Sequence, residues 1–146
     1  METTATYEWH LGTPGADLVR PIREEVFIQE QGFANEFDDI DAIAWHARCL
    51  WDGELAGTIR VFAQPGQPGW YHFGRLCVKR NLRGEHLGAG LMCQAEEKVR
   101  QLGGTAIVLS AQTHARPFYE KLGYTAHGEE YLDEHCPHIE MRKILK

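Results

Sequence analysis

The sequence of 146 residues contains no apolar run close to the ~20 residues that a helix needs to cross a bilayer. Its first ten residues, METTATYEWH, lack both the basic segment and the apolar segment of a signal peptide. Positive charge is also scarce, because 15 Lys and Arg stand against 21 Asp and Glu and give a net charge of -6. That sign disfavours the phosphate backbone of nucleic acid as a partner. We therefore expect a cytoplasmic protein that binds neither a membrane nor nucleic acid.

Closely spaced cysteines are missing as well. Cys49, Cys77, Cys93 and Cys136 lie far apart, and no pair has the C-x-x-C spacing of a zinc or redox site. The local cluster 135–138, His-Cys-Pro-His, is too short and contains a proline, so three of its groups are hard to converge on one ion. The eight histidines are scattered, which argues against a metal-dependent hydrolase. We expect reduced, packed thiols and no metal.

The chain also lacks internal repeats, low-complexity runs and polar linkers. The Gly/Pro-rich stretch 65–69 is too short to separate two domains and indicates a turn between two strands. A hydrophobic content of 43% is typical of one compact domain with a single core. We therefore expect one domain over residues 1–146.

Apolar periodicity predicts the order of the elements. Alternation and a turn at Asp52-Gly53 predict a three-stranded antiparallel meander in the first half of the chain. In the second half, the apolar run 106–109 follows a helix with one apolar stripe, which predicts a parallel pair joined by a crossover helix. The fold class is thus α+β with a mixed, mostly antiparallel central sheet. The stripe consists of Leu87, Leu91, Ala95, Val99 and Leu102. The expected strands are 4–11, 44–51, 55–63, 70–79, 106–110, 124–132 and 138–145, and the expected helices are 16–31, 85–102 and 114–122.

An acidic segment between residues 36 and 41 has no clear periodicity. It contains Glu36, Asp38, Asp39 and Asp41. A solvated loop is one interpretation, and a substrate-facing loop that attracts a cationic ligand is the other.

The turn between the strand 70–79 and the helix 85–102 is rich in small residues. Gly84, Gly88, Ala89 and Gly90 lie near the predicted helix start. Unpaired N–H groups in a first helical turn bind anionic oxygen, and glycines let a ligand approach the backbone closely. A phosphate site is one interpretation, and tight packing of the helix on the sheet is the other.

Two common phosphate motifs do not fit this turn. The P-loop requires a Gly-Lys-Ser/Thr ending, which the residues 90–92, Gly-Leu-Met, do not supply. The dinucleotide fingerprint follows the first strand of a βαβ unit, whereas this turn follows an antiparallel meander.

The run 78–89 resembles motif A of the GNAT superfamily of N-acetyltransferases. In that motif an Arg/Gln-x-x-Gly-x-Gly/Ala loop binds the pyrophosphate of acetyl-CoA through backbone N–H groups. Arg83 and Gly88 match the motif, whereas His86 stands where the middle glycine is usual. The backbone conformation at His86 is thus open, and its side chain is a candidate for phosphate contact.

Further segments extend the resemblance. The run 114–124 resembles motif B of the superfamily, with His114 in place of the common asparagine. The segments 23–32, 36–41, 111–115 and 137–141 resemble the ElaA-like branch of the superfamily, so that the resemblance covers about residues 20–141.

The resemblance implies a GNAT-type fold and the transfer of an acetyl group from acetyl-CoA to a primary amine by direct attack, without a metal. It also implies that the backbone N–H of Val78 polarises the thioester carbonyl and that Tyr119 protonates the departing sulfur. The implied acetyl-CoA site consists of Leu76, Cys77, Val78, Arg83, Gly84, Glu85, His86, Leu87, Gly88, Ala89, Phe118 and Lys121.

The general base is not assigned by the sequence. Glu30, His46, His72 and His138 are candidates because they lie on segments that can face the acceptor, and a water relay is a further possibility. The acidic segment favours a cationic amine, such as a polyamine, an amino sugar or a lysine-like amine. A catalytically silent acyl-CoA-binding module is the alternative function. Exposed strand edges make a homodimer reasonable.

Overall fold

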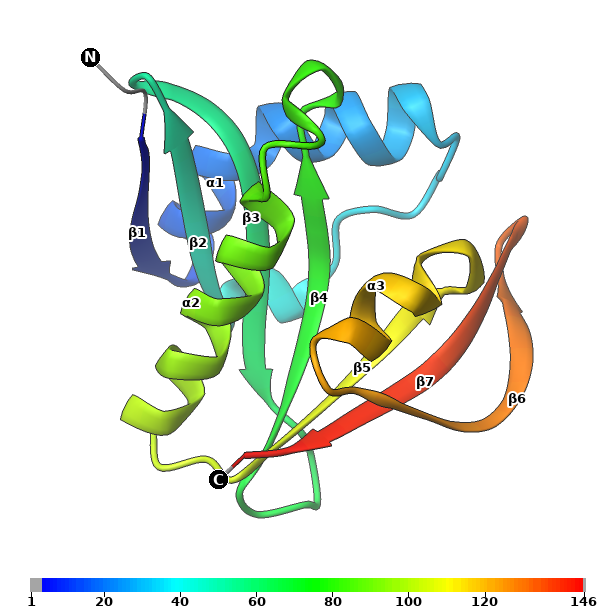
Figure 1. The fold of residues 1–146 in the computed structure, drawn as a ribbon. Coiled ribbons are helices and arrows are strands. Elements are labelled where there is room, and N and C mark those ends of the chain that lie inside the picture. The colour runs from blue at the N-terminus through cyan, green and yellow to red at the C-terminus, as the bar shows by residue number, and fades with distance from the viewer. Residues whose placement is uncertain (1–3, 146) are drawn as a thin grey trace.

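The computed structural model describes residues 4–145, which form a seven-stranded sheet with helices on both faces (Figure 1). The strand order is β1-β2-β3-β4-β5-β7-β6, and the pair β4–β5 is parallel while the other neighbours are antiparallel. This is the predicted α+β class with a mostly antiparallel sheet. The strands are β1 (Ala5–Leu11), β2 (Trp45–Trp51), β3 (Glu54–Ala63), β4 (Trp70–Val78), β5 (Ala106–Gln112), β6 (Thr125–Asp133) and β7 (Cys136–Ile144). The helices are α1 (Gly12–Arg23), α2 (Leu87–Gln101) and α3 (Arg116–Lys121), with a π-helical segment η1 (Glu24–Glu30) and the 3₁₀ turns η2 (Asp39–Ala42), η3 (Arg80–Leu82) and η4 (Thr113–Ala115).

The first helix begins four residues earlier than predicted. Strand β1 ends at Leu11 and α1 follows at once from Gly12, whose φ of 73° is accessible to glycine without strain. Pro21 therefore lies inside α1 rather than near its start. After α1 the chain continues as η1, a π-helical segment of 7 residues. Such segments are rare and frequently occur at functional sites.

Helix α2 forms the predicted crossover between β4 and β5. Its apolar stripe packs on the sheet through Leu87, Leu91, Ala95 and Val99, which are all buried, whereas Leu102 lies beyond the helix and is exposed. A Cβ atom at Gly90 would collide with the hydroxyl of Tyr7. Gly90 thus serves the packing of α2 on the sheet.

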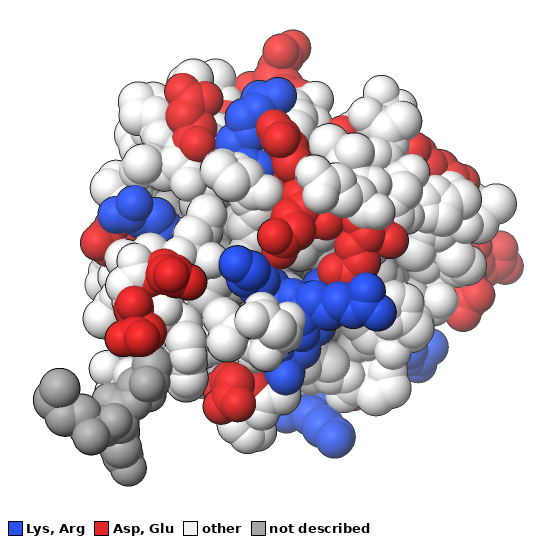
Figure 2. All heavy atoms as spheres, turned by 90° about the horizontal axis from the view of Figure 1, so that it is seen from above, with Lys and Arg blue, Asp and Glu red and all other residues white. Residues whose placement is uncertain are grey.

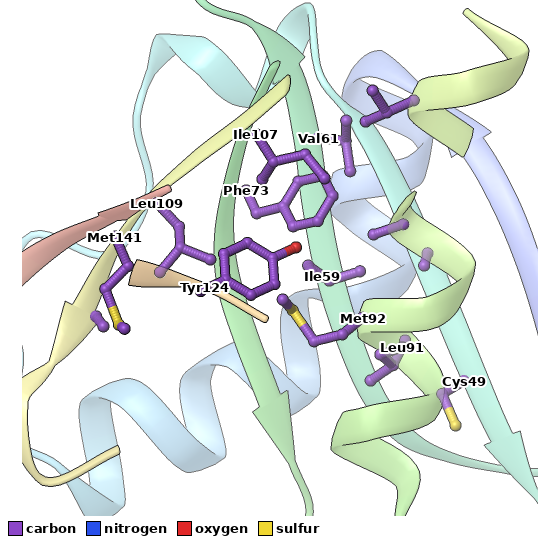
Figure 3. Close-up of a cluster of buried hydrophobic side chains, with 14 of the residues drawn as sticks. Cys49, Ile59, Val61, Phe73, Leu91, Met92, Ile107, Leu109, Tyr124 and Met141 are labelled. Atoms are coloured by element: carbon purple, nitrogen blue, oxygen red, sulfur yellow. The ribbon is translucent and has the colours of Figure 1, made fainter. Parts of the chain in front are cut away.

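The two faces of the sheet have separate cores. Helices α2 and α3 cover one face, called the α2 face, and α1 covers the other, called the α1 face (Figure 1). On the α2 face, Ile59, Phe73, Leu91, Met92 and Tyr124 belong to a large buried cluster (Figure 3). The α1 face has a smaller cluster, formed by Val19, Ile22, Val26, Phe27, Phe33 and Cys77.

Strands β1 and β6 are the two edges of the sheet. Nearly all of β6 is exposed, including Leu132. The predicted homodimer would use such an edge and stays a prediction. Within residues 4–145, no helix combines the length and apolar character that a membrane span requires.

Candidate active site

Strands β4 and β5 part from each other halfway along their length (Figure 1). They pair from Trp70 with Ala106 to Phe73 with Leu109. Beyond this point the register of β3 with β4 shifts, and Arg75 has a φ of 56° in the left-handed region. An extra residue of this kind bends a strand and increases its twist, and such bulges often lie beside active sites. A gap therefore opens between the end of β4 and the end of β5.

The backbone at the end of β4 faces this gap. The N–H of Lys79 donates to the carbonyl of Ala56 on β3, at 2.8 Å. Successive N–H groups of a strand point to opposite sides, so the N–H of Val78 points away from β3 and towards the gap. The carbonyl of Val78 accepts a hydrogen bond from Nε of Arg83, at 3.0 Å.

One cavity of about 570 Å³ occupies the gap and extends to η1 and to the hairpin of β6 and β7. Of the thirteen residues predicted for the acetyl-CoA site and the acid, eleven line this cavity. They are Leu76, Cys77, Val78, Arg83, Gly84, His86, Leu87, Gly88, Ala89, Phe118 and Tyr119. Glu85 and Lys121 lie outside the lining, and the N–H of Glu85 already donates to the carbonyl of Leu82, at 3.4 Å.

The structure gives the backbone conformation of the turn before α2 at His86, which the sequence had not determined. His86 has φ 61° and ψ 21°, the left-handed conformation that glycine adopts most readily. A histidine thus takes the geometry of a glycine here. No side chain caps the N–H groups in the first turn of α2. Those groups are free to bind an anion.

Gly88 does not need to be a glycine for packing. A Cβ atom at this position would lie 3.5 Å from the ring of Phe118, which is an ordinary van der Waals contact. Of the two interpretations of the glycine-rich turn, the packing one therefore holds for Gly90; packing does not explain Gly88, where approach of a ligand stays a prediction.

Arg83 is held by Glu30 rather than pointing freely at the cavity. Its two terminal nitrogens donate to the two carboxylate oxygens of Glu30, at 2.6 and 2.7 Å. This hydrogen bonding lowers the pKa of Glu30, and Glu30 lies outside the cavity lining. A paired carboxylate of lowered pKa is a weak base. Figure 2 shows the molecule from above, at the end where β4 stops and α2 begins. Lys and Arg side chains gather in the middle of this view, with Asp and Glu beside them.

Tyr119 lies on α3 with its ring against two other aromatic rings. The ring centroids of Phe118 and Tyr124 lie 5.0 and 6.2 Å away, both in edge-to-face geometry. Burial raises the pKa of Tyr119 to about 12. The hydroxyl is therefore fully protonated at neutral pH and can donate a proton.

A polar network supports the end of α3 behind Tyr119. The hydroxyl of Tyr124 donates to Glu96 on α2, at 2.8 Å. The ammonium of Lys143 on β7 donates to the same carboxylate at 2.9 Å and to the carbonyl of Leu122 at 2.8 Å. One lysine thus ties α2 and β7 to the chain directly after α3.

The histidines proposed as base have different surroundings. His138 lines the cavity, and its Nδ1 lies 2.9 Å from the carbonyl of Cys136. A carbonyl can only accept, so Nδ1 carries the proton and Nε2 keeps its lone pair. His72 also lines the cavity, but burial and the charge of Arg60 lower its pKa to about 4. His46 is buried outside the cavity lining, with Nε2 3.0 Å from the carbonyl of Asp41.

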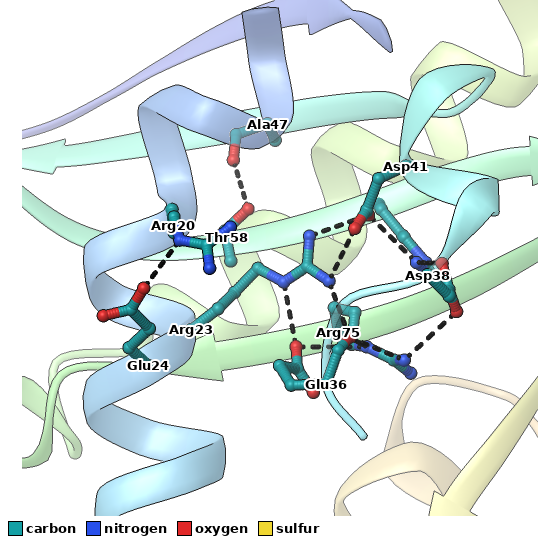
Figure 4. Close-up of polar contacts among 10 residues, drawn as sticks. Arg20, Arg23, Glu24, Glu36, Asp38, Asp41, Ala47, Thr58 and Arg75 are labelled. Carbon is teal, nitrogen blue, oxygen red and sulfur yellow. Dashed lines mark hydrogen bonds and ion pairs between the residues drawn. The ribbon is translucent and has the colours of Figure 1, made fainter. Parts of the chain in front are cut away.

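Two carboxylates of the acidic segment are buried and paired. Arg23 binds Glu36 through Nε and Asp41 through Nη1, each at 2.8 Å, and all three side chains are buried (Figure 4). The interpretation as a solvated loop was wrong for Glu36 and Asp41, which are 4% and 8% exposed, whereas Asp38 and Asp39 are exposed.

Two more arginines complete this network. Arg60 on β3 binds Asp38 at 2.7 Å and Asp41 at 3.0 Å. Arg75 donates to the carbonyl of Glu36 through Nε and Nη2, at 3.1 and 3.0 Å. Three guanidinium groups thus neutralise three of the four carboxylates of the segment, and the fourth, Asp39, lies exposed outside the cavity lining.

Several lining residues were missed from the sequence. Gln31 and Phe33 follow η1. Arg60 and Arg75 lie within β3 and β4, where the sequence pattern indicates ordinary strand residues and no ligand site. A left-handed φ at an arginine has no local sequence pattern. Gln112 could have been found, because it lies in a segment that carries the family resemblance.

Within the described residues, no three His, Cys, Asp or Glu side chains are grouped as metal ligands. In the segment 135–138, Nδ1 of His138 is hydrogen-bonded to the carbonyl of Cys136.

Comparisons with known proteins match nearly the whole chain. The family model described as "Acetyltransferase (GNAT) domain" matches residues 19–145. The "Uncharacterized N-acetyltransferase YjcF" of Bacillus subtilis is 34% identical over 128 residues, which cover 84% of this chain and 87% of that protein. Among solved structures, an acyl-CoA N-acyltransferase from Pseudomonas aeruginosa is 30% identical with a TM-score of 0.82, covering 97% and 99% of the two chains. Escherichia coli ElaA shares the fold, at 24% identity and a TM-score of 0.84, covering 96% and 99%.

Proposed function

The chain belongs to the acetyltransferase (GNAT) domain family and is therefore a transferase, and on that premise we propose that it moves an acetyl group from acetyl-CoA directly to a primary amine. The observation that supports this most is the single cavity that joins the gap beside β4, the turn before α2 and Tyr119.

The donor fits one side of this cavity. The pantetheine arm lies in the gap along residues 76–78, where the backbone edge of β4 is free of β5. The pyrophosphate lies at the turn of residues 83–89, where uncapped N–H groups and the positive end of the α2 dipole favour an anion. Phe118 packs beside Gly88 and encloses the pantetheine arm. Arg83 contributes by bracing the carbonyl of Val78, and direct contact with phosphate requires that it leave Glu30.

The chemistry then needs three groups. The lone pair of the neutral amine attacks the thioester carbon, the N–H of Val78 stabilises the oxygen on which negative charge develops, and the C–S bond breaks as the N–C bond forms. Tyr119 donates its proton to the departing sulfur. His138 accepts the proton that the amine loses, because its Nε2 is the unprotonated nitrogen and its ring lines the same cavity. His72, with a pKa of about 4, is too weak a base for this step.

The setting of the reaction is also a proposal. All four cysteines are free thiols, which supports a reducing compartment and thus the cytoplasm. The acceptor is a small-molecule amine. The exposed edge strand β6 is the surface through which a homodimer would form.

Release of free CoA from acetyl-CoA, measured with a panel of primary amines, tests the proposal. Tyr119→Phe should lower kcat by about 10²–10⁴ and leave the Kd of CoA nearly unchanged, since it removes a proton donor and little contact area. Tyr71→Phe on β4 is the matched control and should keep its activity. An unchanged kcat in Tyr119→Phe would remove this tyrosine as the acid.

The base is tested by chemical rescue. His138→Ala should lose about 10²-fold or more in kcat, and added imidazole should restore part of it. If the wild-type protein binds CoA but releases no thiol with any amine, the chain is a silent acyl-CoA-binding module instead.

A further inference from the structure

The proposed function leaves the class of amine open, and the side of the cavity opposite the donor bears on it. This side, called the acceptor wall, consists of Phe27, Gln31, Phe33, Arg75, Gln112 and His138. It lies between η1, the segment that follows it, and the hairpin of β6 and β7.

The charged side chains behind this wall are paired with one another. Arg60 binds Asp38 through two nitrogens, at 2.7 and 3.0 Å. The carboxylate of Glu36 lies 2.8 Å from Nε of Arg23 and 3.1 Å from Nε of Arg75. A charged group that bound Glu36 or Arg60 would have to displace one of these partners. A displaced charge would be left buried, because Glu36 is 4% and Arg60 is 4% exposed.

Several uncharged polar groups at the wall are paired as well. Gln112 donates to the side-chain carbonyl of Gln31 at 2.8 Å, and its own carbonyl lies 2.7 Å from Nε2 of His114. Ser110 and Tyr131 share a hydrogen bond. Among the described residues, Nε2 of Gln31 and Nε2 of His138 make no side-chain hydrogen bond, so a hydroxyl or amide on the acceptor would find few partners for the hydration that it loses.

Aromatic rings make up the rest of the wall. The ring of Phe33 lies 6.4 Å from that of Phe27, 6.3 Å from that of His138 and 5.0 Å from that of His135. Edge-to-face and tilted arrangements of this kind accept a further ring readily. The surface on offer to an acceptor body is thus apolar and aromatic.

We propose that the acceptor is a primary amine on an uncharged, apolar and preferably aromatic body, of the arylalkylamine class. Its ring packs against Phe27 and Phe33, and its amine reaches His138. The expected preference for a polyamine or an amino sugar is not supported, because three of the four carboxylates on which it depended, Glu36, Asp38 and Asp41, are paired with arginines and Asp39 does not line the cavity.

Two charged groups that line the cavity stand apart from this pairing among the described residues. Nε of Arg60 is buried without a partner. Asp133 is exposed at the end of β6 and makes no side-chain hydrogen bond or ion pair there. Nε of Arg60 is enclosed and cannot be reached by a ligand without rearrangement of the wall. Asp133 lies at the open rim and is the one group through which a cationic acceptor could be favoured, so the experiment includes it.

Matched amines provide the test, with binding and turnover measured separately. 2-Phenylethylamine is compared with phenylalanine, which adds a carboxylate to the same body, and hexylamine with 1,6-diaminohexane, which adds a second ammonium. Binding to the CoA-loaded protein is measured by calorimetry, and turnover by thiol release from acetyl-CoA. The apolar member of each pair should bind at least about tenfold more tightly and react with at least about tenfold higher kcat/KM. Equal or tighter binding of phenylalanine or of the diamine would overturn the inference.

Variants locate the preference on the wall. Phe33→Leu keeps an apolar side chain and loses the ring, so it should lower the affinity for 2-phenylethylamine about three- to tenfold and that for hexylamine less. Its melting temperature, compared with the wild type, controls for folding. Asp133→Asn and the control Glu130→Gln, on the same exposed strand, should leave the affinity for 1,6-diaminohexane unchanged. A selective loss of diamine binding in Asp133→Asn would show that a rim carboxylate selects a cationic acceptor.

The two levels of the proposal fail differently. If 2-phenylethylamine binds with the expected preference but no thiol is released, the acceptor class stands and the transfer reaction falls. If thiol is released chiefly with polyamines or amino acids, the reaction stands and the acceptor class falls. If none of the four amines binds to the CoA-loaded protein, the acceptor class is also wrong.

Discussion

The two faces of the sheet are stabilised by different kinds of interaction. On the α2 face, apolar side chains such as Ile59 and Leu91 fill a large core, and the pair of Glu96 and Lys143 lies at its margin (Figure 3). On the α1 face the apolar cluster is small, and beside it Arg23 holds two buried carboxylates (Figure 4). Apolar packing tolerates small changes of shape, whereas a buried ion network requires every partner to be present.

The difference between the two faces corresponds to the sites of the two substrates in the proposed reaction. The donor gap, the turn before α2 and Tyr119 rest against the α2 face. The acceptor wall rests on the network that fixes the segment around Glu36. The site for the donor is thus built on packing, and the site for the acceptor on charge pairing.

The largest effect is expected from removing the central arginine of the network. Arg23→Met leaves Glu36 and Asp41 buried with fewer partners, and should lower the free energy of unfolding by about 4 kcal/mol. Arg20→Met, three residues away on α1, removes an exposed ion pair with Glu24 and should cost less than about 1 kcal/mol. Urea denaturation of both variants measures the difference. Equal losses would mean that the network adds no more stability than a surface pair.

A cavity on the other face should cost slightly less. Leu91→Ala removes a fully buried side chain from the α2 face and should lower the free energy of unfolding by about 3 kcal/mol. Because no charge is involved, the loss should be the same at low and high salt and between pH 5 and pH 8. A loss that depends strongly on salt would contradict the contrast between the two faces.

The α2 face also has a partly buried ion pair, Lys143 with Glu96, which refines the comparison. Lys143→Met frees the carbonyl of Leu122 and the carboxylate of Glu96, and thereby loosens α3 behind Tyr119. We expect kcat to fall about tenfold, or about 1.4 kcal/mol, with the Kd of CoA nearly unchanged. Lys143→Arg should restore part of the activity, and Arg100→Met on the exposed end of α2 is the control. A loss of CoA affinity equal to the loss of kcat would point to a purely structural role.

The smallest effect is expected in the pH dependence of the network. Burial alone would raise the pKa of Asp41, but hydrogen bonds and the charges of Arg23 and Arg60 outweigh it and lower this pKa below 3.8. Its stabilising contribution is therefore complete well above pH 3.8 and is lost as the pH falls through the lowered pKa. Asp41→Asn should be less stable than the wild type at pH 7, and the difference should shrink below about pH 4. Denaturation at a series of pH values checks this, and a constant difference would contradict it.

The order of the elements could be predicted from local patterns. Alternation, the turn at Asp52-Gly53 and the stripe of α2 predict the meander and the crossover, because periods of 2 and 3.6 reflect which face each side chain buries. Residues of the donor side could be predicted too, because the turn before α2 and the pair Phe118-Tyr119 are contiguous in sequence.

The acceptor side could not be predicted in the same way. Arg23 is hydrogen-bonded to Glu36 and Asp41, which lie 13 and 18 residues further along the chain. Each of these charged residues, taken alone in the sequence, is of a type usually found in solvent. The left-handed residue Arg75 depends on the register of β3 with β4, which is a tertiary property. Candidates for the base could be named, but their ranking needed hydrogen-bond partners such as the carbonyl of Cys136.

Arg75 belongs to both halves of the site at once. Its backbone forms the irregularity of β4 directly beyond the last pair with β5, and its side chain fixes the carbonyl of Glu36. A ligand that widens or narrows the gap shifts this backbone, and the guanidinium group carries the shift into the acceptor wall. The two substrates are therefore expected to bind with linked affinities, and by thermodynamic reciprocity each would change the affinity of the other by the same factor.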